Sequence, residues 1–117
     1  MKIGLIADTH MPGSIDVLWP QVARAFEGVE LILHAGDLHT LDIVDHLGEI
    51  APVYVARGNG DLDIIDERLQ DSWLLERDGL HIGMIHHFPS PIRKSPDHLE
   101  KHLHKHFPEQ LPDILVY

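Results

Sequence analysis

The 117-residue sequence contains no cysteine, which excludes disulfide bonds and thiolate metal sites. It has no apolar run near the roughly 20 residues that a membrane span needs, and no signal-peptide pattern precedes the first expected strand. We therefore expect a cytoplasmic protein with no membrane partner. Basic residues are also scarce, since 9 Lys and Arg oppose 19 Asp and Glu. The formal net charge of −10 argues against general nucleic-acid binding.

The residues that are abundant favour one folded domain with an affinity for cations. Hydrophobic residues make up 44% of the chain, which is ordinary for a globular protein. The length fits a single domain over residues 1–117. Eleven histidines accompany the excess of carboxylates. Imidazole and carboxylate groups both suit divalent metals, so the composition indicates a metal-binding protein.

The first half of the chain alternates short apolar runs with helix-like segments. The expected order is strand, helix, strand, helix, strand, over residues 3–7, 20–28, 31–35, 40–48 and 52–56. The apolar runs lack alternation, which is typical of parallel strands that are buried on both faces. Thr40 is the expected N-cap of the second helix, and Gly48 is its expected stop. This order predicts an α/β fold with a parallel sheet.

The second half of the chain departs from this alternation. Residues 73–77 and 80–85 flank Asp78-Gly79, a dipeptide that strongly favours a two-residue hairpin turn. A helix is expected from Ser95 to Phe107, with one apolar stripe along it. Residues 114–117 read as one more buried strand. The second half therefore predicts a hairpin, a helix and a final strand.

Polar residues follow several of the expected strands. They are Asp8, His10, Asp37, Asn59, Asp61 and His86. In open α/β sheets, ligands bind beyond the carboxyl ends of the strands, so these side chains are expected at one edge. Carboxylate, amide and imidazole groups suit manganese, iron, nickel or zinc. A carboxylate that bridged two such ions could support an in-line phosphoryl displacement by a metal-activated water.

The series Asp8-x-His10, Gly36-Asp37, Gly58-Asn59-x-Asp61 and His86 resembles the calcineurin-like metallophosphoesterases, above all their small single-domain phosphodiesterase branch. The resemblance implies a four-layer αββα sandwich with two divalent metals, among which manganese is favoured over nickel, iron and zinc. It implies that Asp8 and His10 bind the first metal, that Asp37 bridges, and that Asn59 and His86 bind the second. A hydroxide between the metals would attack a small phosphoester, and no catalytic side chain beyond the ligands is expected.

Two departures from the family pattern qualify this expectation. Gly60 stands where many relatives carry a histidine that assists the leaving group, which favours activated diesters over monoesters. Asp61 is then expected to support the ligands rather than to bind metal. The family's Gly-His-x-His segment is not found in the 117 residues, so we expect a domain that is incomplete at its C-terminus. The alternative function is a non-catalytic scaffold with an eroded site, and a homo-oligomer is left open.

Two further groups of residues have more than one interpretation. Arg57 could bind the substrate phosphate, or it could form an ion pair with Asp61 or Asp63. His34 is interpreted as a packed or supporting residue. A row of histidines, at positions 98, 102 and 106, falls four residues apart on the expected last helix. We interpret this row as a solvated face, with metal binding as the alternative.

Overall fold

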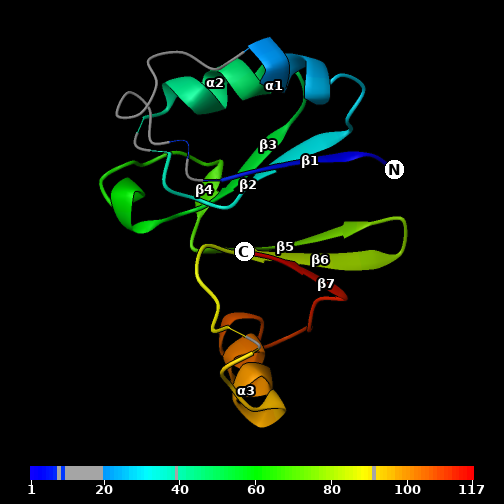
Figure 1. The fold of residues 1–117 in the computed structure, drawn as a ribbon, viewed down its shortest axis with the longest axis vertical. Coiled ribbons are helices and arrows are strands. Elements are labelled where there is room, and N and C mark those ends of the chain that lie inside the picture. The colour runs from blue at the N-terminus through cyan, green and yellow to red at the C-terminus, as the bar shows by residue number, and fades with distance from the viewer. Residues whose placement is uncertain (8, 10–19, 39, 91) are drawn as a thin grey trace.

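The computed structural model describes residues 1–7, 9, 20–38, 40–90 and 92–117 (Figure 1). It has four layers, in the order helices, sheet, sheet, helix (Figure 1). The predicted αββα sandwich is therefore confirmed. Within the described ranges, no helix is long and apolar enough to cross a membrane.

The first sheet consists of four parallel strands in sequential order. They are β1 (Ile3–Ile6), β2 (Leu31–His34), β3 (Val53–Ala56) and β4 (Leu69–Gln70). Helices α1 (Pro20–Ala25) and α2 (Asp42–Gly48) cover one face of this sheet (Figure 1). The core on that face is fully buried at Ile32, Ile43, Val44, Leu47 and Val55. Because all the strands run the same way, their carboxyl ends meet at one edge.

The second sheet has three strands, of which two form the predicted hairpin. They are β5 (Ser72–Arg77), β6 (Leu80–Ile85) and β7 (Ile114–Val116), and β7 is parallel to β6. The turn residues Asp78 and Gly79 have φ values of 52° and 78°. Both values lie in the left-handed region, as a type I′ turn requires. The Asp-Gly prediction is therefore confirmed.

The two sheets pack face to face through apolar and polar contacts. The buried residues between them are Leu31, Leu33, Ala35, Ala56, Ile82 and Met84. The indole Nε1 of Trp73 donates to the Val55 carbonyl oxygen at 2.8 Å. The Trp73 and Tyr54 rings meet edge to face, with centroids 4.9 Å apart. These contacts hold β5 against β3 and thereby fix the position of one sheet on the other.

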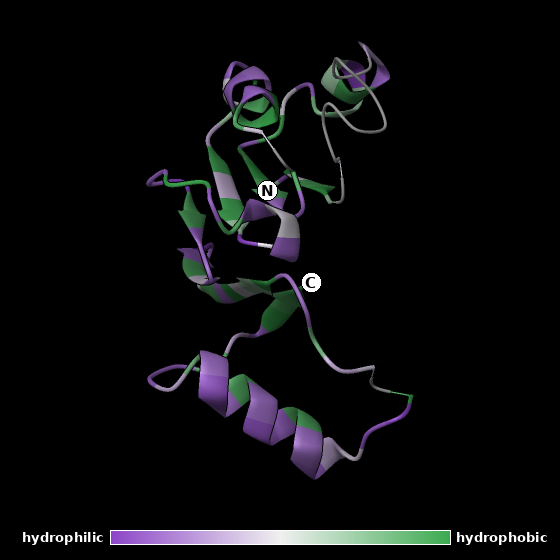
Figure 2. Cartoon of the chain, turned by 90° about the vertical axis from the view of Figure 1, so that its left-hand side faces the viewer, coloured by the Kyte–Doolittle hydropathy of each residue, from purple (hydrophilic) through white to green (hydrophobic). Residues whose placement is uncertain are grey.

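Helix α3 (Pro96–His106) forms the fourth layer and projects from the second sheet (Figure 2). The helix starts where it was expected, and Ser95 is its N-cap, because the Ser95 Oγ accepts a hydrogen bond from the His98 backbone N–H. No residue of α3 is buried, but the next residue, Phe107, is only 4% exposed. Its ring lies against Gly83, where a Cβ would come within 2.9 Å of it. Phe107 therefore anchors the C-terminal end of the helix to β6.

Four local predictions are wrong. The last strand is not buried, because no residue of β7 is buried and Ile114 is 47% exposed. Thr40 does not cap α2, because the helix begins one residue later than a Thr40 cap requires, with Leu41 at the cap position and no side-chain hydrogen bond there. Gly48 is the last helical residue rather than the stop, and Glu49 follows in right-handed helical geometry. β1 is not buried on both faces: it is an edge strand, and Leu5 is 57% exposed. The second sheet covers β2 and β3 but leaves this side chain uncovered.

Candidate metal centre

The turn after β2 places Asp37 at the carboxyl edge of the first sheet in an unusual backbone conformation. Gly36 has φ 108° and Asp37 has φ 61°, both in the left-handed region. A Cβ on Gly36 would lie 2.5 Å from the Ala56 carbonyl oxygen and 2.5 Å from His86 Nδ1. Only glycine fits at position 36. A non-glycine residue rarely adopts the conformation of Asp37 unless the surroundings hold it there.

The side chain that holds Asp37 is the carboxylate of Asp61, which is fully buried. Its Oδ2 accepts from the backbone N–H groups of Asp37 at 2.7 Å and Gly58 at 3.0 Å. Its Oδ1 accepts from the Leu38 N–H at 3.0 Å. One carboxylate thus ties the turn after β2 to the turn after β3. This position is that of a support for Asp37 rather than of an accessible ligand.

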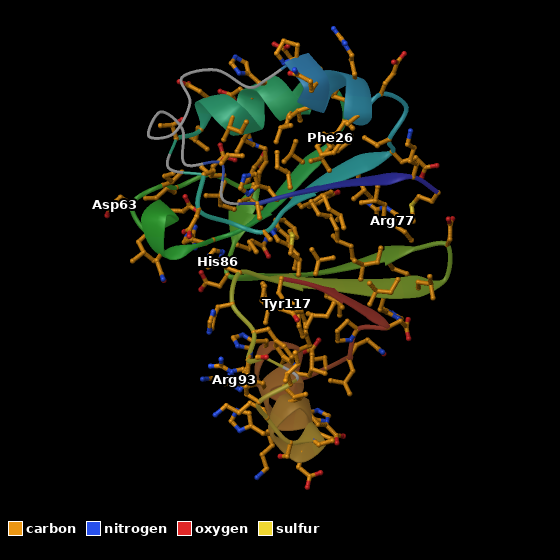
Figure 3. All side chains as sticks on the ribbon, viewed as in Figure 1. Phe26, Asp63, Arg77, His86, Arg93 and Tyr117 are labelled. Carbon is orange, nitrogen blue, oxygen red and sulfur yellow. The ribbon has the colours of Figure 1, made fainter. Side chains whose placement is uncertain are left out.

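His86 follows β6 and brings the second sheet to the same site, at one end of the sandwich (Figure 3). Its Nε2 lies 3.2 Å from Asp37 Oδ2. Its Nδ1 lies 2.6 Å from the Ala35 carbonyl oxygen. A carbonyl can only accept, so Nδ1 carries the proton and donates. In the neutral ring, the lone pair of Nε2 then faces Asp37 Oδ2, which is also an acceptor. A cation or a proton between the two atoms would give each of them a partner.

Asn59 opens the short turn η1 (Asn59–Asp61), which wraps around Asp37. The Gly60 N–H donates to Asp37 Oδ1 at 3.0 Å. A Cβ on Gly58 would collide with the Asp37 carboxylate and lie 2.6 Å from its backbone nitrogen. The backbone of this turn therefore lies directly against Asp37, with no room for a side chain at position 58. Asn59 itself is exposed at the start of the turn.

Asp8 and His10, the predicted ligands of the first metal, lie outside the described residues. Thr9, between them, lies with its Oγ1 3.1 Å from His34 Nε2. The buried His34 ring also accepts a bond at Nδ1 from the Gly36 N–H at 3.0 Å. A neutral His34 thus donates from Nε2 to Thr9 and links the end of β1 to the Asp37 turn. Sequence reasoning placed His34 in a supporting role but gave no sign of this link.

The described part of the predicted ligand set is Asp37, Asn59 and His86. Among the residues that the structure describes, no three His, Asp or Glu side chains form a group that could hold a metal. Asp37 and His86 are brought together directly, whereas the contact from the Asn59 turn is made by the backbone N–H of the next residue, Gly60. The described residues therefore provide one close pair of possible metal ligands, Asp37 and His86, at the strand ends.

Arg57, the predicted substrate-binding residue, forms its ion pair outside this group. Its Nη1 lies 3.1 Å from Asp71 Oδ1, and its Nη2 donates to the Ile64 and Leu69 carbonyl oxygens at 3.5 Å each. The alternative interpretation, an ion pair with Asp61 or Asp63, is wrong, because the ion pair is made with Asp71. Asp61 is taken up by backbone N–H groups, while Asp71 directly follows β4, the neighbour of β3. No sequence pattern indicated β4, and so Asp71 was missed.

A second charged group fixes the loop that leads from the site to β4. The Arg68 guanidinium bonds Asp66 at 2.8 Å and Asp45 of α2 at 3.1 Å. Hydrogen bonds from Arg68 lower the pKa of Asp66 from 3.8 to about 2. The same bonds raise the pKa of Arg68 above its usual range. This network ties the loop to the first helical layer.

The domain described as the calcineurin-like phosphoesterase superfamily domain matches residues 1–117. The chain belongs to this superfamily. A probable metallophosphoesterase of Methanothermobacter thermautotrophicus is 43% identical to this chain over 86 residues, which are 74% of the chain and 49% of the relative. A second, from Methanocaldococcus jannaschii, is 36% identical over 86 residues, or 74% of the chain and 43% of the relative. The matched region thus spans about half the length of these relatives.

Solved structures share the fold of this chain. A structure described as a novel archaeal phosphodiesterase matches with a TM-score of 0.65 and 23% identity, over 100% of this chain and 72% of that one. Vps29 of Entamoeba histolytica complexed with zinc matches with a TM-score of 0.66 and 24% identity, over 98% and 62%. Vps29 of Chaetomium thermophilum, complexed with a cyclic peptide, matches with a TM-score of 0.59 and 18% identity, over 97% and 55%.

Proposed function

We propose that this phosphoesterase chain contributes to a metal-dependent phosphodiesterase with a binuclear centre and a small phosphoester substrate. The observation that carries the proposal is the Asp37–His86 pair. When His86 is neutral with its proton on Nδ1, two acceptor atoms, Nε2 and Oδ2, face each other at 3.2 Å beside a left-handed Asp37. Such an arrangement suits a cation, and these donor types fit a borderline divalent metal.

In this proposal, Asp37 bridges the two ions. Asp8 and His10 hold the first ion, and Asn59 and His86 hold the second. Manganese is the favoured metal. When bound, the metals would polarise the phosphoryl group and supply hydroxide at neutral pH. Other residues of the chain hold these ligands in place. Asp61 holds the backbone N–H of Asp37, and the Ala35 carbonyl keeps the His86 proton on Nδ1.

The preference for diesters rests on Gly60. A glycine has no side chain with which to protonate a leaving group, so the leaving group must depart with little acid assistance. The Gly60 N–H is also engaged with Asp37 Oδ1. Activated diesters, whose leaving groups are stable anions, satisfy this condition better than phosphomonoesters.

The test compares Asp37→Asn with Asp63→Asn, which removes the same charge from an exposed position nearby. Asparagine tolerates the left-handed conformation of residue 37, so the fold should persist. Manganese binding is measured by calorimetry, and hydrolysis is measured on bis(p-nitrophenyl) phosphate. We expect the wild type to bind two ions per chain, Asp37→Asn to lose binding and turnover, and Asp63→Asn to keep both. Full activity in Asp37→Asn would refute the proposal.

A second candidate function is a non-catalytic scaffold. Gly60 favours the scaffold, because an eroded site would also lack the histidine that assists the leaving group. The same titration separates the two functions. A chain that binds manganese but hydrolyses neither diesters nor monoesters supports the scaffold, whereas turnover that depends on Asp37 excludes it.

A further inference from the structure

Helix α3 carries three histidines on one face, in a part of the molecule that the proposed phosphoesterase site does not use. His98, His102 and His106 are four residues apart, so successive side chains are neighbours on the helix surface. The ring centroids of the first pair are 5.5 Å apart, and those of the second pair are 5.7 Å apart. The rings are tilted by 36° and 43°. The row is therefore continuous, with His102 in both pairs.

The middle ring is held in place by an aromatic contact from outside the helix. Phe88 meets His102 edge to face, with centroids 6.0 Å apart and an angle of 88°. Phe88 in turn contacts Tyr117 at 5.5 Å. His102 and His106 are half-buried, whereas His98 is exposed. None of the three is buried, so the row lies on an accessible face of α3, as interpreted from the sequence, with two of its members partly shielded from solvent.

The surroundings of His102 favour its neutral form. Partial removal of the ring from water lowers its pKa, and the charges of His106, His98, Lys105 and His87 lower it further. A neutral imidazole is the form that binds metal. Its lone pair is therefore available at neutral pH.

We propose that α3 binds one Cu²⁺, Ni²⁺ or Zn²⁺ ion through two of these imidazoles, with His102 as the ligand common to both alternative pairs. Two imidazoles on one metal, with bonds of about 2.0–2.1 Å, place their centroids roughly 5 Å apart, so the observed spacings need only a small adjustment. No three described His, Asp or Glu residues form a metal group, so water completes the coordination.

The proposed site differs from the strand-end centre in the metal it takes. Imidazole pairs bind copper, nickel and zinc far better than manganese, which is weakest in the series of divalent ions. His98 and His106 are two turns apart, about 12 Å along the axis, so they cannot share an ion without His102. The row therefore offers two overlapping chelates, and one residue is essential to both.

His104 provides a matched control on the same helix. It lies off the row, and its Nε2 is 3.6 Å from Glu100 Oε1. It removes one histidine from α3 when substituted, without touching either pair. If copper binding depended only on the number of histidines in α3, His104→Ala would weaken it as much as a substitution in the row.

The experiment is a Cu²⁺ titration of the whole chain, followed by electron paramagnetic resonance, on the wild type and on four alanine variants. We expect hyperfine coupling to two nitrogens in the wild type. His102→Ala should weaken this site about 100-fold, because the two-point attachment is lost. His98→Ala and His106→Ala should each weaken it about twofold, since one chelate of two remains. His104→Ala should leave it unchanged.

Circular dichroism checks that α3 stays helical, and His102→Gln serves as a second variant that fills the space beside Phe88. Copper held at the strand-end centre would survive all four alanine substitutions. Three results would overturn the proposal. They are unchanged two-nitrogen coupling in both His102 variants, an equal loss in His104→Ala, or a complete loss in His98→Ala or His106→Ala alone.

Discussion

Replacing Asp61 with asparagine removes one buried charge at almost constant shape. Among the described residues, its two oxygens accept from three backbone N–H groups, those of Asp37, Gly58 and Leu38. An asparagine amide has one accepting oxygen, and its NH₂ group can only donate. In the better orientation, the oxygen keeps the bonds from Asp37 and Gly58. The NH₂ group then faces the Leu38 N–H, and that donor is left without a partner.

The cost follows from these bonds. One lost bond to a charged group contributes about 1.5–3 kcal/mol, and the two that remain weaken because the amide is neutral. We therefore expect Asp61→Asn to lower the free energy of unfolding by about 2–4 kcal/mol. Asp61→Ala would leave all three donors unpaired, at about 1–3 kcal/mol each. That sum is comparable with the whole stability of a small domain, so asparagine is the informative variant.

Urea unfolding at equilibrium measures the change, with Asp63→Asn as the control for charge alone. Asp63 is exposed, so its variant should stay within about 0.5 kcal/mol of the wild type. The slope of the transition should not change in either variant. If Asp61→Asn were as stable as Asp63→Asn, the three hydrogen bonds would contribute nothing, and the assignment of Asp61 as the support of the site turns would be wrong.

Gly58→Ala should unfold the site turns, because the new Cβ would collide with the Asp37 carboxylate. In the control Gly48→Ala, the Cβ meets nothing within 4 Å and should stabilise α2 by up to about 1 kcal/mol, so thermal melting should shift the two variants in opposite directions. Asp66→Asn should cost at most about 2 kcal/mol at neutral pH, and less after solvent screening. The native pKa of Asp66 is depressed to about 2 by Arg68, so this stabilisation is complete above about pH 4 and is lost as the pH falls through 2. A pH series of unfolding curves in which the difference between the two proteins did not shrink as the pH fell from 4 to below 2 would contradict this origin.

The parts of the fold that the sequence predicted well are those whose chemistry is local. Asp78-Gly79 can adopt two successive left-handed conformations, and Ser95 can cap a helix without help from the rest of the chain. β4 was missed because its two residues are too few to show a period. It exists because the neighbouring strand offers the Val55 and Arg57 N–H groups to the Arg68 and Gln70 carbonyls. A strand of this kind is defined by its partner and not by its own residues.

The candidate site shows the same division. Parallel strands share a carboxyl edge, so Asp37 and the Gly58–Asp61 turn could be placed together from their positions alone. His86 belongs to the other sheet, and its approach to Asp37 depends on how the sheets pack. Its place after an expected strand made it a candidate, and the family resemblance implied its role as a ligand. The partner of Arg57 could not be predicted, because Asp71 is placed by β4.

His86 also determines how the molecule can open. It extends from β6 of the second sheet, yet both ring nitrogens face atoms that follow β2 of the first, the Ala35 carbonyl and the Asp37 carboxylate. Any fluctuation that parts the sheets at this end must break both contacts at once. Amide hydrogens near Ala35 and His86 should therefore exchange in one cooperative step. A cation held between Asp37 and His86 would slow that step in proportion to its occupancy, so hydrogen exchange could report on metal binding without any substrate.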